Sequence, residues 1–231
     1  PVPTVYLFTL YTLILWFTIR WHAVSSWRYS VPLGLLIGAT ILVNPFDAVA
    51  ILIPLLWNVF DNESLRNKWI LFKVNYLQVQ NSMLCTLAAI IPLIFFRDFF
   101  SATFHYTGYS NDAVFQFGKY FWQVLFSVRD GWLIYTPVAV FALAGFYFLA
   151  ENNKKIFSST FLFFFLNLLL IAGWSVCSNE KNFGLQAMIP SFAVLSIPLG
   201  FLVQRLLAAG KLVKFPLFII IGGMILLNLF Q

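Results

Sequence analysis

The sequence predicts an all-α protein, built as a polytopic bundle of about seven to eight transmembrane segments. Of its 231 residues, 61% are hydrophobic and only 10% are charged, whereas a soluble domain has about 25% charged residues. The apolar residues gather in blocks that alternate with short charged connectors, and the basic connectors fall on every second gap. Such a chain cannot hide its apolar surface in one water-soluble core, so we expect it to face lipid.

Eight apolar blocks make up the predicted segments. They cover Val2–Ile19, Val31–Val43, Ala48–Phe60, Ser82–Phe96, Trp132–Ala150, Ile156–Trp174, Ala187–Val203 and Phe215–Phe230. Crossing a bilayer core takes about 20 apolar residues, with about 17 as a lower limit. The fifth to seventh blocks meet this length and the first nearly does.

The second and third blocks are each too short to cross a bilayer alone. They flank the run Asn44-Pro45-Phe46-Asp47, and proline interrupts a helix. We therefore expect two short helices that meet at a break near one membrane face. One long, kinked helix is the alternative.

The connectors also carry structural signals. The long connector Arg97–Gly131 is rich in aromatic residues, which prefer the lipid–water boundary, so short interfacial or re-entrant helices are expected there on the external side. On the opposite side, the segment Trp69–Gln80 mixes polar and apolar residues as a surface helix does.

The basic residues set the orientation, because they accumulate on the cytoplasmic side of membrane proteins. If the first block runs inward, ten of the fourteen Lys and Arg residues lie inside. These are Arg20, Arg28, Arg66, Lys68, Lys73, Lys154, Lys155, Arg205, Lys211 and Lys214. The net charge of +6 then follows from topology and does not indicate nucleic-acid binding.

Polar residues near membrane depth are the best functional candidates, because burying a polar side chain there is unfavourable in free energy unless it is paired or hydrated. Asp47 has two interpretations. It caps the following helix, since Asp is a favoured cap, or the helix start forms part of an external anion site.

Two further polar clusters are predicted on the external side. Arg129, at the mouth of a span, has the fixed donor fork that suits a phosphate, or it pairs with Asp130 or lipid headgroups. The run Ser178–Gln186 is the most polar in the chain and reads first as a solvated loop. Within it, Glu180 is a candidate acid–base group.

Neither the cysteines nor the histidines predict a metal site. Cys85 and Cys177 fall at different depths and form no disulfide framework. His22 and His105 lack a nearby second ligand. We therefore expect no metal and no cofactor.

Three segments resemble bacterial GT-C-type membrane glycosyltransferases, the group that includes protein O-mannosyltransferases and the lipid A aminoarabinose transferase, with versions from Bacteroidetes-like bacteria the most similar. The strongest match is Leu125–Pro137, which is similar to the family's LFSxRKGWLxYTP segment. Gly34–Asp47 and Asn182–Leu199 look like two further family segments. Asn44 and Gln186 stand where the family has arginines, whereas Arg129 is retained.

The resemblance implies a function. Such enzymes move a sugar from a polyprenyl phosphate carrier to an acceptor on the external face, using an acidic residue of the first external loop. The chain begins at Pro1 without an initiator methionine or signal features. We therefore expect residues 1–231 to be one transmembrane domain, the C-terminal part of a larger inner-membrane protein, with the catalytic carboxylate upstream of Pro1.

Residue by residue, the resemblance assigns binding of the carrier phosphate to Arg129, while Asp47 and Glu180 shape the sugar or acceptor site. The matching positions complete the expected substrate-binding set. They are Asn44, Gln186 and Tyr135. The partners expected are membrane lipid, the polyprenyl-phosphate-linked sugar and other integral membrane proteins.

The alternative is a non-catalytic integral subunit that packs within a membrane complex. The loss of two family arginines motivates it, and small residues such as Ala142, Ala144, Gly145 and Gly222-Gly223 allow close helix approach. A transporter or channel fits less well, because ion paths place ionisable residues within the spans and the charges here sit in or beside connectors.

Overall fold

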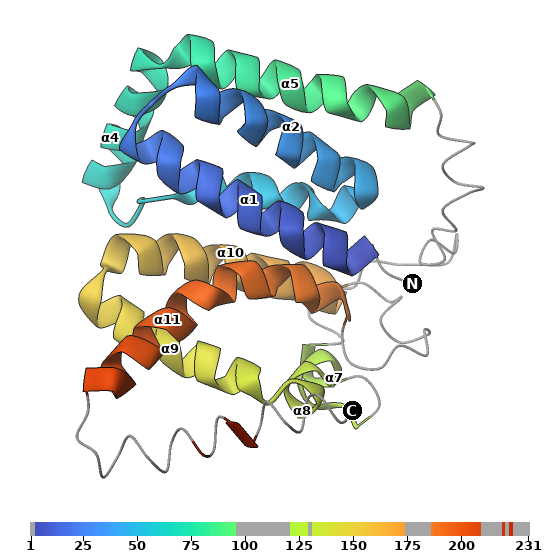
Figure 1. Cartoon of the computed structure of the whole chain (residues 1–231), viewed down its shortest axis with the longest axis vertical. Coiled ribbons are helices and arrows are strands. Elements are labelled where there is room, and N and C mark those ends of the chain that lie inside the picture. The colour runs from blue at the N-terminus through green and yellow to red at the C-terminus, as the bar shows by residue number, and fades with distance from the viewer. Residues whose placement is uncertain are drawn as a thin grey trace. The chain divides into compact units, whose positions relative to one another are not determined.

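The computed structural model of the chain describes residues 3–95, 121–128, 131–173, 186–208, 219 and 222–223. Every element within these ranges is a helix (Figure 1), which confirms the all-α prediction. The chain divides into two compact units, Pro1–Asp112 and Ala113–Gln231. Each unit is described by itself, and one transmembrane domain over residues 1–231 stays a prediction.

The first unit contains three long helices, of which α2 contacts both α1 and α5 (Figure 1). Its elements are α1 (Pro3–Ala23), α2 (Trp27–Val43), η1 (Pro45–Ile51), α3 (Leu52–Leu56), α4 (Asn62–Val74) and α5 (Tyr76–Phe95). The fourth apolar block therefore begins six residues earlier as a helix than its composition predicts, because polar residues at the start of α5 continue the same helix.

Two glycines bring α2 and α5 into close contact. A Cβ atom at Gly34 would lie 2.1 Å from the Ser82 carbonyl oxygen, and one at Gly38 would lie 2.5 Å from Ala89 Cβ. Thr86 Oγ1 donates a hydrogen bond to the Gly34 carbonyl at 2.9 Å. Glycines four residues apart share one face of a helix, and this spacing is typical of membrane helices that pack backbone to backbone.

The break between the second and third apolar blocks is confirmed. Helix α2 ends at Val43, and Asn44 has an extended backbone with φ −151° and ψ 113°. The extended backbone of Asn44 follows from Pro45, because proline disfavours helical backbone at the residue before it. Pro45 itself begins η1. The alternative of one long, kinked helix is wrong.

A charged helix, α4, follows this pair. Asp61 caps it: its side chain accepts from the Ser64 backbone N–H at 2.7 Å, and Ser64 Oγ accepts from the Asp61 N–H at 2.8 Å. The helix ends at Asn75, where α5 follows. The surface helix predicted over Trp69–Gln80 is therefore wrong in its bounds, since this cap begins a helix earlier and Asn75 divides the segment.

The second unit is built around α9, α10 and α11. Its elements are α7 (Phe121–Phe126), α8 (Trp132–Tyr135), α9 (Val138–Asn152), α10 (Lys154–Gly173), η3 (Gln186–Ser191) and α11 (Phe192–Ala208). Of the long aromatic connector, α7 is the helix that falls within the described residues. The last apolar block lies outside them except for 219 and 222–223.

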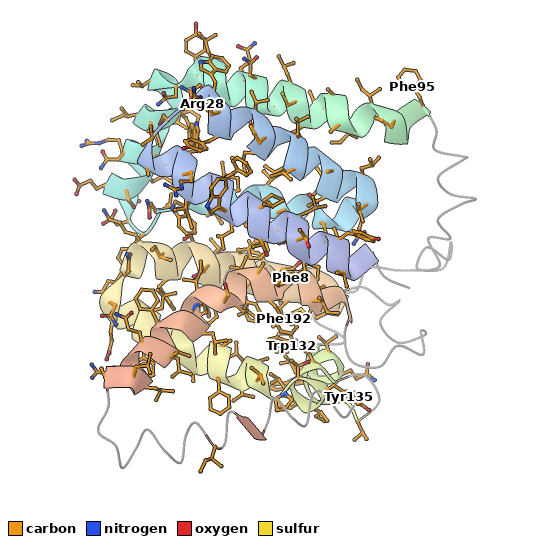
Figure 2. All side chains as sticks on the ribbon, in the orientation of Figure 1. Phe8, Arg28, Phe95, Trp132, Tyr135 and Phe192 are labelled. Atoms are coloured by element: carbon orange, nitrogen blue, oxygen red, sulfur yellow. The ribbon has the colours of Figure 1, made fainter. Side chains whose placement is uncertain are left out.

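Aromatic rings fill the core of the second unit. Trp132 is 1% exposed, and its ring centroid lies 5.7 Å from that of Phe164 and 6.2 Å from that of Phe192 (Figure 2). A Cβ atom at Gly145 would lie 2.2 Å from the Pro198 carbonyl oxygen, so α9 and α11 touch through their backbones. The close approach that Gly145 allows is therefore between two helices of this chain.

Two helical segments of the described chain are long and apolar enough to cross a membrane, judged by length and composition. They are Lys154–Gly173 and Met188–Ala208. Shorter apolar helices cover Trp27–Val43, Asp47–Leu56 and Val138–Asn152.

Candidate functional site

Asp47 lies at the break after α2 and is 8% exposed. Tyr11 Oη donates a hydrogen bond to Asp47 Oδ1 at 2.7 Å, and Asn44 Nδ2 donates to Oδ2 at 2.7 Å. Asp47 lies inside the first turn of η1, and Ile51 takes the N-cap position of α3, so the interpretation of Asp47 as the cap of the following helix is wrong. The carboxyl group instead ties α1 to the break between α2 and η1.

This arrangement brings two of the predicted residues, Asn44 and Asp47, into direct contact. It also uses Tyr11, which sequence reasoning missed. Its signal was a hydroxyl in the middle of the first apolar block, where a buried polar group needs a partner. The partner itself was not predictable, because it lies 36 residues away.

The segment with the strongest family match forms a tight elbow between α7 and α9. The Gly131 N–H donates to the Ser127 carbonyl at 2.8 Å, and a Cβ atom at Gly131 would lie 2.3 Å from that same oxygen. Tyr135 Oη donates to the Val128 carbonyl at 2.6 Å. Trp132 then enters the core, so the motif's glycine, tryptophan and tyrosine all hold this elbow together.

The other predicted site residues fall at the edges of the described structure. Arg129, Asp130 and Glu180 lie outside the described residues, as does Cys177. Gln186 begins η3, and its side chain also lies outside them. The predicted substrate-binding set is therefore represented by Asn44 and Asp47 in the first unit and by Tyr135 in the second.

A buried basic cluster joins the end of α1 to α4, and sequence reasoning gave it no role. His22 Nδ1 donates to the Thr18 carbonyl at 2.8 Å, which leaves Nε2 as an acceptor. Lys68 Nζ donates to that Nε2 atom, to the Pro54 carbonyl at 2.8 Å and to the Trp57 carbonyl at 3.0 Å. Two of its three hydrogen bonds thus hold the end of α3, and the third binds His22 on α1.

Burial controls the protonation of this cluster, which lies beyond the end of the first apolar block. Burial and, to a smaller extent, the nearby Lys68 lower the pKa of His22 to about 4, while the hydrogen bond to the Thr18 carbonyl opposes the shift. Burial also lowers the pKa of Lys68 to about 7. A neutral imidazole beside an ammonium group matches the hydrogen bonds observed, because Lys68 needs an acceptor there.

The first unit also contains a cavity of about 380 Å³ lined by residues of α1 to α5 and η1. Its wall is mostly apolar. It is formed by Trp21, Ser30, Leu33, Ile37, Ile51, Pro54, Leu55, Phe72, Gln78, Val79, Ser82, Met83, Thr86 and Leu87. Trp21 Nε1 donates to Gln78 Oε1 at 2.9 Å, which closes one end of the wall with a paired polar group.

Within the described ranges, no three His, Cys, Asp or Glu side chains come together as a metal-binding group would require. The thiol of Cys85 is free and half-buried on α5.

Comparison with known proteins adds no assignment to these residues. No protein-family model matches the chain, and neither a curated protein nor a solved structure matches it. The membrane glycosyltransferase family therefore stays a prediction that rests on the short motifs of the sequence.

Proposed function

We propose that the protein is a divergent membrane glycosyltransferase that moves a sugar from a polyprenyl phosphate carrier to an acceptor on the non-cytoplasmic face of the bacterial inner membrane. The observation that carries the proposal is the elbow over Leu125–Pro137. This is the segment with the most specific family match, and three of its matched residue types have a structural role there.

The elbow supports the resemblance because its residue types are interdependent. Gly131 has no space for a side chain against Ser127, and Tyr135 reaches back to the Val128 carbonyl. A chance match of short apolar strings does not require such contacts. Arg129, which lies outside the described residues, follows Val128 directly in sequence, and the planar donor fork of an arginine suits a phosphate.

The membrane part of the proposal rests on composition and helix length. The two segments Lys154–Gly173 and Met188–Ala208 have the length and apolarity of membrane spans. Large hydrophobic side chains also face outward on α1 and α5, for example Tyr6 at 70% and Leu87 at 62% exposure. We propose seven to eight segments in all, with the basic connectors inside.

Asp47 and Asn44 have an indirect part in this proposal. Both oxygens of the Asp47 carboxyl group receive hydrogen bonds from Tyr11 and Asn44. The group therefore shapes the end of α2 and the following break, and the acid–base chemistry falls to other residues. Glu180 and Gln186 keep the roles that the resemblance implies.

The test is binding of the carrier phosphate. The full chain, purified in detergent, is titrated with a short-chain polyprenyl phosphate, and Arg129→Gln is compared with Arg66→Gln, an exposed arginine of α4. Arg129→Gln should weaken binding roughly tenfold or more, because it removes a charge-assisted contact, whereas Arg66→Gln should leave binding unchanged. Equal binding by both variants would contradict the assignment of the phosphate to Arg129.

The sidedness of the same proposal is checked in sealed vesicles with single cysteines in a chain that lacks Cys85 and Cys177. Val128 is 83% exposed and Asn152 is exposed at the end of α9. The proposal expects a membrane-impermeant thiol reagent to reach these two positions from opposite sides. Labelling of both from one side would exclude it.

One observation favours a second candidate, a non-catalytic integral subunit. Asn44, which stands where the family has an arginine, donates its amide to Asp47 within the same chain. Asn44 thus stabilises the fold at a position where the resemblance implies a substrate-binding arginine. This candidate is supported if the purified chain binds no polyprenyl phosphate and is recovered in a stable complex with another membrane protein.

A further inference from the structure

One end of the first unit carries exposed tryptophan and arginine side chains that the proposed function does not use. Helix α1 ends there, α2 and α5 begin there, and α4 runs across their ends (Figure 1). Lys68 of α4 binds His22 in the last turn of α1. The ring centroid of Phe72 on α4 also lies 6.0 Å from that of Trp21. An amphipathic helix in such a position lies in the plane of a membrane surface, so this end is where the proposed bilayer meets water.

Aromatic rings from α1 and α2 form a surface at this end. Trp16 is 46% exposed and Trp27 is 44% exposed. The ring centroid of Trp16 lies 6.4 Å from that of Tyr29, so the surface extends over both helices. Large aliphatic side chains beside it are exposed too, with Ile19 at 43% and Val24 at 64%. Exposed tryptophan among apolar side chains is typical of the lipid–water boundary.

The same surface is positively charged. The guanidinium carbon of Arg20 lies 5.6 Å from the centroid of the Trp16 ring, a cation–π contact. Arg28, in the first turn of α2, is exposed at this end (Figure 2). Since no Asp or Glu precedes Asp47 in the sequence, α1 and α2 contain no carboxylate that offsets these two charges. Guanidinium groups stack on aromatic rings and donate in plane to phosphate oxygens.

We propose that the surface formed by Trp16, Arg20, Trp27, Arg28 and Tyr29 binds the headgroups of anionic phospholipids on the cytoplasmic side of the membrane. Two fixed cations complement the negative headgroups, which attract basic side chains near the bilayer surface. The tryptophan rings then lie beside the glycerol and the first acyl carbons. The proposal rests on the membrane embedding and orientation proposed above, and it does not depend on transferase activity. The polyprenyl phosphate carrier is assigned to the opposite face, so a phospholipid is the occupant expected here.

The experiment uses the full chain in phosphatidylcholine nanodiscs. Each sample contains a trace of photoreactive phosphatidylglycerol or photoreactive phosphatidylcholine, with the same diazirine close to the acyl ester, so the two probes differ only in the headgroup. After illumination, mass spectrometry measures the label on residues 16–29. Phosphatidylglycerol should label this segment about tenfold or more above phosphatidylcholine, because each arginine near the surface contributes about fivefold.

Substitutions locate the effect. Arg20→Gln and Arg28→Gln should each lower the phosphatidylglycerol labelling by about fivefold and leave the phosphatidylcholine labelling unchanged. Arg20→Lys keeps the charge and should retain most of the labelling. Arg66→Gln is the matched control, because it also removes one exposed arginine of this unit. Glu63, three residues before Arg66 on α4, offsets its charge, so Arg66→Gln should label like the wild type.

Two further measurements separate charge recognition from folding. Raising the salt to about 1 M should remove most of the preference for phosphatidylglycerol, because exposed charges are then screened beyond about 3 Å. Arg20→Gln should unfold at the same temperature as the wild type in circular dichroism, because Arg20 is exposed. If the loss of the Trp16 contact lowers its stability, Arg28→Gln provides the same test.

Three results would overturn the proposal. The first is equal labelling of residues 16–29 by the two probes, or no labelling by either, which would assign the surface to a second copy of the chain. The second is an equal loss in Arg20→Gln and Arg66→Gln. The third is displacement of the phosphatidylglycerol probe by a short-chain polyprenyl phosphate but not by the same amount of unlabelled phosphatidylglycerol, which would assign the surface to the carrier. Because phospholipid labelling is the readout, failure here is distinguishable from failure of the Arg129 binding test.

Discussion

The two units of the chain hold their helices together by different means. In the first unit, polar side chains from elements distant in sequence meet in pairs, buried for Tyr11 with Asp47 and half-buried for Trp21 with Gln78. In the second unit, aromatic rings around Trp132 form a continuous core, and Asn167 Nδ2 donates to Ser191 Oγ at 2.6 Å as a buried polar pair.

The difference matters for what each unit can tolerate. A buried polar pair requires a defined geometry, since losing one partner leaves the other unpaired in a low-dielectric site. A core of aromatic rings is stabilised by the apolar area that it buries and by the fit of the rings to one another, and each ring has several neighbours. We therefore infer that the first unit is the more sensitive to conservative polar changes and to pH, whereas both units are sensitive to changes of size at their glycine contacts.

The largest effect is expected at those glycine contacts. Gly34→Leu should lower the free energy of unfolding by about 3 kcal/mol or more, because the new side chain meets the Ser82 backbone and forces α2 away from α5. Gly145→Leu should act similarly through Pro198. Thermal unfolding of the purified chain, followed by circular dichroism, measures both.

Gly200→Leu is the matched control for this pair, because nothing lies within 4 Å of a Cβ atom built at Gly200 on α11. It should be neutral, or stabilising by about 0.5–1 kcal/mol through better helix propensity. If Gly34→Leu behaved like Gly200→Leu, the described packing of α2 against α5 would be wrong.

A smaller effect is expected from the polar pair at the break. Tyr11→Phe keeps the ring but removes the donor to Asp47 Oδ1, so it should cost about 2 kcal/mol of stability. Tyr6→Phe, on the same helix at a position 70% exposed, should change little. Equal unfolding temperatures for the two variants would show that the Tyr11–Asp47 hydrogen bond does not stabilise the first unit.

The smallest effect is a pH dependence from His22. Its pKa in the folded chain is lowered to about 4, so the unfolded chain binds this proton more tightly. The stabilisation is complete above the ordinary pKa of about 6.5 and is lost as the pH falls from there towards 4. Below pH 7 Lys68 is mainly protonated in both states, so its own titration contributes little in this range.

We expect a loss on the order of 1–2 kcal/mol between pH 6.5 and 5 from this group. His22→Gln keeps an acceptor for Lys68 that does not titrate, so the variant should have a flatter stability profile than the wild type. Unfolding temperatures of both proteins across this pH range give the comparison. Parallel profiles would rule out His22 as the source of the pH dependence.

Several elements were predictable because their signals are local. Composition and apolar blocks predicted an all-α chain, and Asn44-Pro45 predicted the break after α2, since proline removes a backbone donor and restricts the residue before it. The start of α4 was predictable in principle from Asp61 and Ser64, whose spacing satisfies a helix N-terminus. For the elbow over Leu125–Pro137, the sequence supplied a motif but not the hydrogen bonds that form the turn.

The contacts within the first unit were not predictable from such signals. Tyr11 meets Asp47 across 36 residues, Lys68 meets His22 across 46, and Gln78 meets Trp21 across 57. Hydrophobic periodicity tells which residues prefer lipid or core, but it does not give the rotation and offset of one helix against another. The capping interpretation of Asp47 failed for this reason, because the Tyr11 hydroxyl comes from a different helix.

The sequence by itself therefore determined the all-α fold class and the broken pair after α2, because composition and proline act over a few neighbouring positions. Only the tertiary structure decided that Asp47 binds Tyr11, that Lys68 holds the end of α3, and that Trp21 binds Gln78. These depend on how helices pack side by side, and the close approach at Gly34 and Gly38 sets that packing in the first unit.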